Sequence, residues 1–302
     1  MPKRGVTIIG APSSAGAHHA GQEQAPAALR AAGFVERLRT GGIDVADLGD
    51  VVDATFTLDD PAANARGLST VVDVARAVAR AVAGVLAGNR LPVVLGGDCT
   101  ITLGVVAGVQ SAHPDVGLVY FDGDADLDTP ETTGIGVLDA MGVAHLLGLT
   151  DNQLARLGER WPMLDPAHLA LFGYDDCDLD PYEQAALASL PSLVRYTSPE
   201  VRSTPTANAA AALATLCRAS DHLVVHFDVD AIDSRELPLG NFPHYGTGVS
   251  LKSAGDALTM FYRAPQLVAA VMTEINPSYD PSGVSLGRYV DTVSRALIAG
   301  LN

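Results

Sequence analysis

Residues 119–128, VYFDGDADLD, place four aspartates at alternate positions directly after an apolar run: Asp122, Asp124, Asp126 and Asp128. Short apolar runs rich in β-branched and aromatic residues are typical of buried strands. Carboxylates gathered at one end of a strand raise one another's pKa unless cations neutralise them. The stretch therefore predicts a core strand that ends at an acidic, cation-binding edge.

Five other apolar runs have a similar form and alternate with Ala-rich helical stretches, two of which lie near 71–87 and 205–219. Continuous apolar runs suit parallel strands that are buried on both faces, with helices as the crossovers between them. We therefore expect an α/β fold, a three-layer α/β/α sandwich with a mainly parallel central sheet. No linker, repeat or charge block interrupts the pattern, so we expect one domain over residues 1–302. The predicted strands lie within residues 5–12, 91–98, 115–124, 168–176, 222–230 and 267–277.

The composition argues against several classes of partner. A formal net charge of −16 disfavours binding to nucleic acid or to an anionic membrane surface. No apolar window approaches the roughly 20 residues that a membrane-spanning helix needs, and the first residues hold too short an apolar run for a signal peptide. The three cysteines form no paired framework. We expect a cytoplasmic protein whose partner is a small molecule.

Polar residues follow the last apolar residue of four predicted strands, in the sequences LGGDCT, YFDGDADLD, HFDVDAID and MTEINP. In open parallel sheets, ligands bind at this carboxyl edge. An isolated D-x-D pair is weak support for a metal, because aspartate is common in turns. Two such pairs, Asp122 with Asp124 and Asp228 with Asp230, together with Asp126, favour a metal site.

Four motifs resemble, in order and spacing, those of the arginase/agmatinase (ureohydrolase) family. They are GGDCT at 96–100, DGDAD at 122–126, FDVDAID at 227–233 and EINP at 274–277, and residues 11–30 are similar to the family's opening loop and helix. The resemblance implies an α/β/α fold and a binuclear metal centre, usually manganese, whose bridging hydroxide attacks the central carbon of a guanidinium or amidine group. It also implies a homo-oligomer, a trimer or a hexamer.

The chain departs from the family at both metal-binding histidines, which are replaced by Cys99 and Asp124. Every position nevertheless keeps a side chain that can bind a metal, which argues against a decayed site. Carried over by position, the resemblance implies two ligand sets that share two aspartates. The first set is Cys99, Asp122, Asp126 and Asp228, and the second is Asp122, Asp124, Asp228 and Asp230.

The two replacements change the charge and the softness of the ligands. Five aspartates and one thiolate supply six negative charges, two more than the family's four aspartates and two neutral histidines, and anionic ligands weaken a metal's Lewis acidity. Cys99 favours zinc or iron over manganese, whereas Asp124 favours a hard cation such as manganese or magnesium. We hypothesise two unlike divalent metal positions; a protonated carboxylate or a single ion are alternatives.

On the substrate side, Glu274 matches the family glutamate that receives the guanidinium, whose planar fork of donors suits a carboxylate. Asp128 stands where arginases have asparagine, and Thr133 matches a threonine of the same loop. Ile135 and Val137 replace small polar residues that hold the amino-acid end of the substrate. The resemblance therefore implies a guanidino, N-modified guanidino or amidino substrate but not the usual amino-acid clamp.

A second acidic segment, YDDCDLDPYE, resembles the arginase segment that contacts the substrate's α-amino group. Asp178, Asp180 and Glu183 align with it only with a short insertion. The alternative for these residues is a helix N-terminus enriched in acids.

Three residues are candidates for catalysis: the metal ligand Asp126, then Asp139, which replaces a proton-shuttling histidine, and His244 as a substitute shuttle. Asp139 can act as an acid only if its pKa is raised. Elsewhere, we expect Cys177 and Cys217 to be structural, and His18 and His19 to face solvent near the mouth of the site.

Two function hypotheses remain. The first is a metal-dependent hydrolase of a C–N bond in a guanidino or amidino compound. The second is a catalytically silent relative that acts as a binding or oligomer partner, in which excess charge and the missing histidine have abolished hydrolysis. A haloacid-dehalogenase-like phosphatase also carries D-x-D after a strand, but two such strands and the EINP motif do not fit that pattern.

Overall fold

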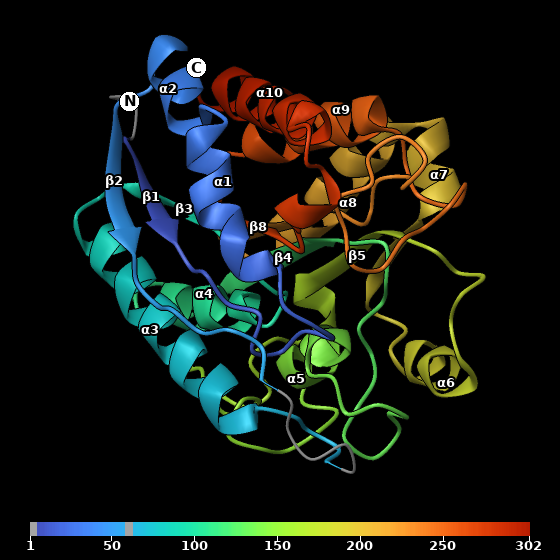
Figure 1. Ribbon diagram of the computed structural model, residues 1–302. Coiled ribbons are helices and arrows are strands. Elements are labelled where there is room, and N and C mark those ends of the chain that lie inside the picture. The colour runs from blue at the N-terminus through green and yellow to red at the C-terminus, as the bar shows by residue number, and fades with distance from the viewer. Residues whose placement is uncertain (1–4, 58–62) are drawn as a thin grey trace.

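The computed structural model describes residues 5–57 and 63–302. Its centre is a sheet of eight parallel strands in the order β2-β1-β3-β8-β7-β4-β5-β6 (Figure 1). The strands are β1 Val6–Gly10, β2 Val45–Asp50, β3 Leu91–Leu95, β4 Val116–Phe121, β5 Leu169–Tyr174, β6 Val194–Thr197, β7 His222–Asp228 and β8 Leu267–Thr273.

The six predicted strands are confirmed, and the sequence analysis missed the two edge strands. Only Val45 of β2 is buried, and no residue of β6 is. An edge strand has a neighbour on one side alone and stays partly in solvent, so it lacks the continuous apolar run of a strand covered on both faces.

Helices cover both faces of the sheet, which confirms the predicted three-layer sandwich (Figure 1). The two Ala-rich stretches form α3 and α8, as predicted. The helices are α1 Ala25–Ala31, α2 Phe34–Thr40, α3 Leu68–Ala87, α4 Ile101–Gln110, α5 Gly142–Leu146, α6 Pro181–Ser189, α7 Ser198–Ser203, α8 Pro205–Ala219, α9 Leu251–Tyr262 and α10 Val284–Leu301.

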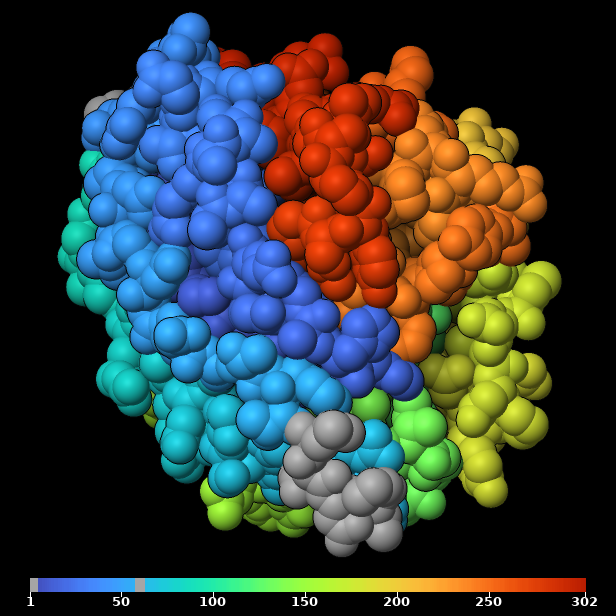
Figure 2. All heavy atoms as spheres, in the orientation of Figure 1, coloured from blue at the N-terminus to red at the C-terminus, as the bar shows by residue number. Residues whose placement is uncertain are grey.

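Two hydrophobic cores lie between the layers, because successive side chains of a strand point to opposite faces. On β4, Val119 and Phe121 join the core under α8, α9 and α10, whereas Leu118 and Tyr120 join the core under α3 and α4. The first and last parts of the chain meet, since α2 packs against α10, and Figure 2 shows them side by side in blue and red. None of the helices in the described ranges is long and apolar enough to cross a membrane.

The four central strands β3, β8, β7 and β4 are neighbours, and all of them run in the same direction. The segments that follow them therefore meet at one edge of the sheet. Cys99 follows β3, Glu274 follows β8, Asp228 ends β7 and Asp122 follows β4. Residues separated by more than 150 positions are brought to one place.

Candidate metal centre

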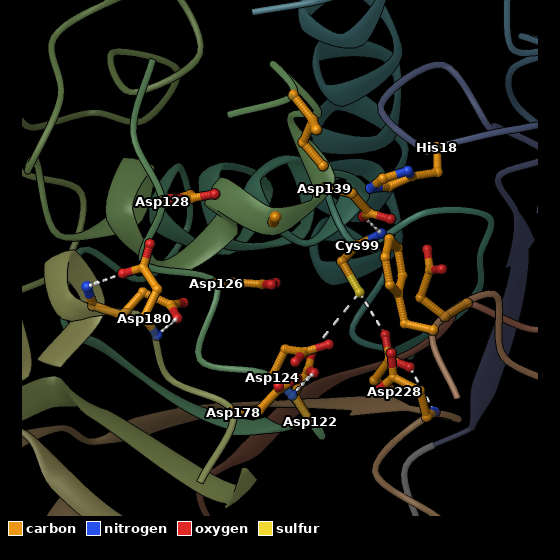
Figure 3. A pocket seen from close by; sticks show the side chains of 16 residues that line it. His18, Cys99, Asp122, Asp124, Asp126, Asp128, Asp139, Asp178, Asp180 and Asp228 are labelled. Atoms are coloured by element: carbon orange, nitrogen blue, oxygen red, sulfur yellow. Dashed lines mark hydrogen bonds between the residues drawn. The ribbon is translucent and has the colours of Figure 1, made fainter. Parts of the chain in front are cut away.

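A cavity of about 250 Å³ opens at the carboxyl edge of the central strands (Figure 3). Eleven of its sixteen lining residues are aspartate or glutamate, and none is lysine or arginine. Such a wall repels anions and attracts cations. The predicted site residues on this wall are Cys99, Asp122, Asp124, Asp126, Asp128, Asp139, Asp180, Glu183, Asp228, Asp230 and Glu274.

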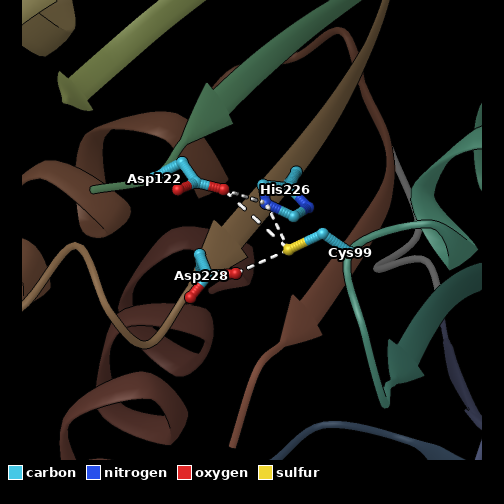
Figure 4. Close-up of side chains that lie close together, drawn as sticks. All are labelled: Cys99, Asp122, His226 and Asp228. Carbon is cyan, nitrogen blue, oxygen red and sulfur yellow. Dashed lines mark hydrogen bonds and ion pairs between the residues drawn. The ribbon is translucent and has the colours of Figure 1, made fainter. Parts of the chain in front are cut away.

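A first group of metal-binding side chains combines a thiol, an imidazole and two carboxylates (Figure 4). Cys99 Sγ lies 2.6 Å from Asp228 Oδ2 and 3.9 Å from Asp122 Oδ2. His226 Nε2 lies 3.3 Å from Asp122 Oδ2 and 3.8 Å from Cys99 Sγ. All four side chains are buried.

A second group consists of carboxylates alone, Asp122, Asp124 and Asp230, and shares Asp122 with the first group. The D-x-D spacing has a local cause here. The backbone N–H of Asp124 donates to Asp122 Oδ1 at 2.8 Å, and that of Asp230 donates to Asp228 Oδ1 at 2.8 Å. Each pair is therefore a tight turn that presents two carboxylates to the same space.

Asp126 lies in neither group, although it lines the cavity. Its carboxylate accepts a hydrogen bond from the hydroxyl of Tyr120, and its backbone φ is 51°. Glu274 also has a positive φ, 64°. Side chains other than glycine rarely adopt this left-handed conformation, and such strain is often found at functional sites.

The buried acidic groups of the two donor groups raise one another's pKa, which favours the binding of cations. Burial and the charge of Asp124 raise the pKa of Asp122 to about 7. Burial and neighbouring carboxylates also raise the pKa of Asp228 and Asp230, and burial with the charge of Asp228 raises that of the Cys99 thiol. A nearby positive charge reverses these shifts. The donor set of carboxylates, thiol and imidazole thus fits divalent metal ions.

The sequence analysis missed His226. It stands two residues before Asp228 on β7, so both side chains point to the same face of the strand, and this spacing was the available signal. The ring stacks on Tyr120 with centroids 4.0 Å apart, and Nδ1 lies 2.8 Å from Thr102 Oγ1. Burial lowers the pKa of His226 to about 3, which keeps the ring neutral.

Glu274 lies beside the first group. Gln22 Nε2 donates to Glu274 Oε2 at 2.9 Å, whereas the buried Oε1 receives no N–H group from the described residues, and the Glu274 carboxyl group otherwise pairs with that of Asp139. Asp139 is close to Glu274 and accepts the backbone N–H of Cys99 at 2.7 Å. Burial and the charge of Asp98 raise the pKa of Asp139, so it meets the condition for an acid. Gln22 carried no signal in the sequence, since its partner is 252 positions away.

The side of the cavity opposite Cys99 and Asp228 is formed by Asp128 and the segment around α6 (Figure 3). Asp180 caps α6 by accepting the backbone N–H groups of Tyr182 and Glu183, and Glu183 accepts the N–H of Asp180. Asp180 and Glu183 therefore cap the N-terminus of α6 and also form part of the cavity wall. Burial raises the pKa of Glu183 to about 7.

Two loop residues do not reach the wall. Thr133 Oγ1 accepts the backbone N–H groups of Ile135 and Gly136 and so shapes the loop. Val137 is buried, and only Ile135 of this loop lines the cavity.

His244 is buried behind Asp124 and does not line the cavity. Its Nε2 lies 3.3 Å from Asp124 Oδ2. Burial opposes the charged ring, but the hydrogen bond to Asp124 and the charges of Asp124 and Asp230 outweigh it and raise the pKa of His244 to about 10.

Two expectations at the periphery are wrong. His18 does not face solvent; it lines the cavity and packs edge-on against Phe242 with ring centroids 4.4 Å apart, because the N-terminal loop folds over the site. Its neighbour His19 is exposed, as expected. Cys177 is exposed and so has no structural role in the core, whereas Cys217 is partly buried on α8.

Comparisons with known proteins agree with this geometry. The sequence model of the arginase family matches residues 4–298. The arginase of Bacillus caldovelox is 30% identical over 278 residues, which cover 91% of this chain and 92% of that protein. Its native structure matches with a TM-score of 0.86 at 28% identity and 98% coverage of both chains. The structure of Entamoeba histolytica arginase in complex with L-ornithine matches with a TM-score of 0.88 at 25% identity, covering 98% of this chain and 99% of the other.

Proposed function

Since the chain belongs to the arginase family, we propose that it is a metal-dependent hydrolase of a C–N bond in a guanidino compound whose other end is cationic. The observation that carries this proposal is Glu274 Oε1, a buried carboxylate oxygen on the wall of the cavity that receives no N–H group from the described part of the chain. A guanidinium supplies the planar N–H donors that this oxygen lacks. Hydrolysis converts the substrate and water into urea and the protonated amine.

The proposal assigns the metal to the buried donor atoms. Two divalent ions would be held by Cys99, Asp122, Asp228, Asp124 and Asp230, with Asp126 beside them, and manganese is the metal that the family resemblance favours. The chemistry that such ions would supply is a lowered pKa for a water molecule, which makes it a nucleophile near neutral pH. The chain's own residues then orient the guanidinium and supply the proton for the leaving amine.

Three residues next to the ligands have distinct tasks. Glu274 binds the guanidinium and is itself held by Gln22. Asp139, on the cavity wall beside Glu274, donates a proton to the leaving amine. His244 acts through Asp124, because its ring contacts the Asp124 carboxylate and does not line the cavity. It fixes the orientation of Asp124 and relays protons through it.

The charge of the opposite wall defines the substrate's other end. Asp128, Asp180 and Glu183 line it, and none of the sixteen described residues that line the cavity is lysine or arginine. A carboxylate placed there is repelled, whereas an ammonium group is attracted. Arg66 approaches His18 but does not reach the wall. We therefore assign the protein a guanidine that carries a distal amine, in preference to an amino acid or a guanidino acid.

A urea-release assay on metal-loaded protein tests this assignment with three matched probes: 4-aminobutylguanidine, 4-guanidinobutyrate and L-arginine. We expect turnover of the amine probe, weak turnover of arginine and none of the acid. Glu274→Gln removes the charge that receives the guanidinium and is expected to lower kcat/KM by about 10- to 100-fold. Glu131→Gln, on the exposed loop, is the control. A preference for the guanidino acid would contradict the charge argument.

The silent relative is the second candidate, favoured by the surplus of negative charge in the ligand set. It predicts no urea from any probe by protein that binds metal fully. Under either candidate we propose a cytoplasmic homo-oligomer, a trimer or hexamer, and sedimentation of the purified chain tests its assembly.

A further inference from the structure

His226 has no place in the ligand sets that the family resemblance implies, yet it lies inside the first donor group. Its Nε2 is 3.3 Å from Asp122 Oδ2 and 3.8 Å from Cys99 Sγ (Figure 4). The ring is fully buried. Asp126, which the resemblance places in this group, instead accepts the hydroxyl of Tyr120.

The surroundings of His226 hold its ring as a metal ligand needs to be held. Thr102 Oγ1 lies 2.8 Å from Nδ1, and the ring stacks almost parallel on Tyr120, at 3°. A ligating histidine usually hydrogen-bonds through its other ring nitrogen, which fixes the tautomer and the ring's orientation. In the tautomer in which Nδ1 carries the proton and donates it to Thr102 Oγ1, the Nε2 lone pair faces Cys99 and Asp122 and is available to a metal ion.

The spacing of the donor atoms matches a small tetrahedral site. Zinc bonds of about 2.0 Å to nitrogen and oxygen and 2.3 Å to sulfur give donor-to-donor edges of roughly 3.3 Å between nitrogen and oxygen and roughly 3.5 Å from either to sulfur, so the sulfur edges observed here need to shorten by a few tenths of an ångström. The edges observed are 3.3 Å from His226 to Asp122, 3.8 Å from His226 to Cys99 and 3.9 Å from Cys99 to Asp122. The exception is the 2.6 Å contact of Cys99 with Asp228, a thiol-to-carboxylate hydrogen bond that a cation replaces.

Another donor group borders this one. Cys99 also lies close to Asp139 and Glu274, and Glu274 is the residue assigned above to the guanidinium, so the His226 group lies next to the proposed substrate site. In addition, a neutral imidazole in place of Asp126 removes one negative charge from the ligand set.

We propose that His226 is a metal ligand, and that Cys99, His226, Asp122 and Asp228 form a mixed sulfur, nitrogen and oxygen site for zinc or another thiophilic divalent cation. Thiolate and imidazole favour such metals, whereas the neighbouring oxygen-only group of Asp122, Asp124 and Asp230 favours manganese or magnesium. The proposal rests on the proposed function and deepens it, because it makes the two metal positions chemically unequal.

Cobalt binding to the full-length protein, purified without a chelating column and stripped of metal, tests the assignment. We expect a sulfur-to-cobalt charge-transfer band that is lost in Cys99→Ser. In His226→Gln the ligand-field bands should change, and zinc affinity, measured by competition with a chromophoric chelator, should fall at least tenfold. His145→Gln is the matched control, because His145 is equally buried but bonds to Met141 and Asn152 outside both groups.

X-ray absorption on the zinc-loaded wild-type chain keeps the test independent of how the variants fold. We expect one sulfur and one imidazole in the zinc coordination shell. A shell of oxygen alone, a shell with sulfur but no imidazole, or an unchanged zinc affinity in a folded His226→Gln would each overturn the proposal.

The outcome is separable from the proposed function. If zinc is bound through sulfur and imidazole but no guanidine releases urea, the metal-site proposal is supported and the proposed hydrolase function is contradicted. If urea is released by protein whose metal shell contains neither sulfur nor imidazole, the hydrolase function is supported and the metal-site proposal is contradicted.

Discussion

Gly123 shows how little room the D-x-D turn leaves. A Cβ built on it would lie 2.6 Å from His244 Cδ2, 2.8 Å from Nε2 of the same ring and 2.9 Å from the carbonyl oxygen of Asp230. Real Cβ atoms essentially never come this close to other heavy atoms. The residue between the two aspartates is therefore small because His244 packs directly against the turn.

We predict that Gly123→Ala displaces His244 and the turn, and so weakens metal binding by about 10- to 100-fold, as loss of outer-shell support usually does. Calorimetric titration of stripped protein with manganese measures the effect. Gly134→Ala is the control, since its Cβ would meet nothing within 4 Å. Equal affinity in Gly123→Ala and wild type would show that His244 does not support the site.

Gln22 gives a second prediction at the same scale. Its amide donates to Glu274 Oε2 from a fully buried position, so it holds the carboxylate that faces the cavity. Gln22→Met keeps the size but loses the amide, and we expect guanidine binding to weaken by about tenfold, the equivalent of 1.4 kcal/mol. Metal content should stay unchanged. Isothermal titration with 4-aminobutylguanidine measures this, with the exposed Gln24→Met as control; a loss of metal instead would place Gln22 in the support of the metal groups.

Among the elements, the edge strand β2 depends on charge more than on burial. Arg30 of α1 holds Asp47 with two hydrogen bonds, at 2.8 and 3.0 Å, and Asp50 with a third at 2.6 Å. A bidentate arginine pair of this kind is stronger than a typical surface ion pair. The edge strand β2, which lacks a continuous apolar run, is thus held by an ion pair with helix α1 in addition to its pairing with β1.

We predict that Asp47→Asn lowers the free energy of unfolding by about 1 kcal/mol at neutral pH. Burial alone would raise the pKa of Asp47, but hydrogen bonds from Arg30 and from the Gly49 N–H outweigh it and lower the pKa. The stabilisation is therefore full above the unfolded pKa of about 3.9 and is lost as the pH falls through the lower folded value. Urea unfolding across pH 3–7 measures the difference. Asp73→Asn, in a 3.7 Å pair with an 80% exposed carboxylate, is the control and should change nothing.

At the scale of the whole molecule, the acidic groups sit where the four central strands end, so their mutual repulsion acts on the middle of the sheet. A bound cation replaces repulsion by attraction at that place. Because a ligand that binds only the folded state stabilises it, metal and fold should be thermodynamically linked.

We predict that a chelator lowers Tm by several degrees and that excess metal restores it, since metal at 100 times its Kd contributes about 2.7 kcal/mol. Scanning calorimetry with and without metal measures the shift. In Asp228→Asn the dependence on metal should largely disappear, while stability in chelator should equal or exceed that of wild type, because one repelling charge has gone. A wild-type Tm that is independent of metal would contradict the linkage.

The sequence by itself determined the central fold and the place of the site. Six continuous apolar runs implied buried parallel strands, and parallel strands with polar residues after them bring those residues to one edge. The two D-x-D turns could also be recognised in the sequence, because each is formed by a hydrogen bond between residues only two positions apart. These features depend on local spacing, which a single chain displays directly.

Only the tertiary structure decided which side chains share a donor group. His226 meets Cys99 because β7 and β3 flank β8, and Asp126 turns to Tyr120 through a left-handed backbone position. Gln22 reaches Glu274 from the other end of the chain. Such contacts join strand ends and loops that are far apart in sequence. Strand order and packing decide which of these side chains meet, and the local spacing of apolar and polar residues carries no information about either. The acidic edge of the sheet was therefore predictable from the sequence, whereas the residues that form each donor group were not.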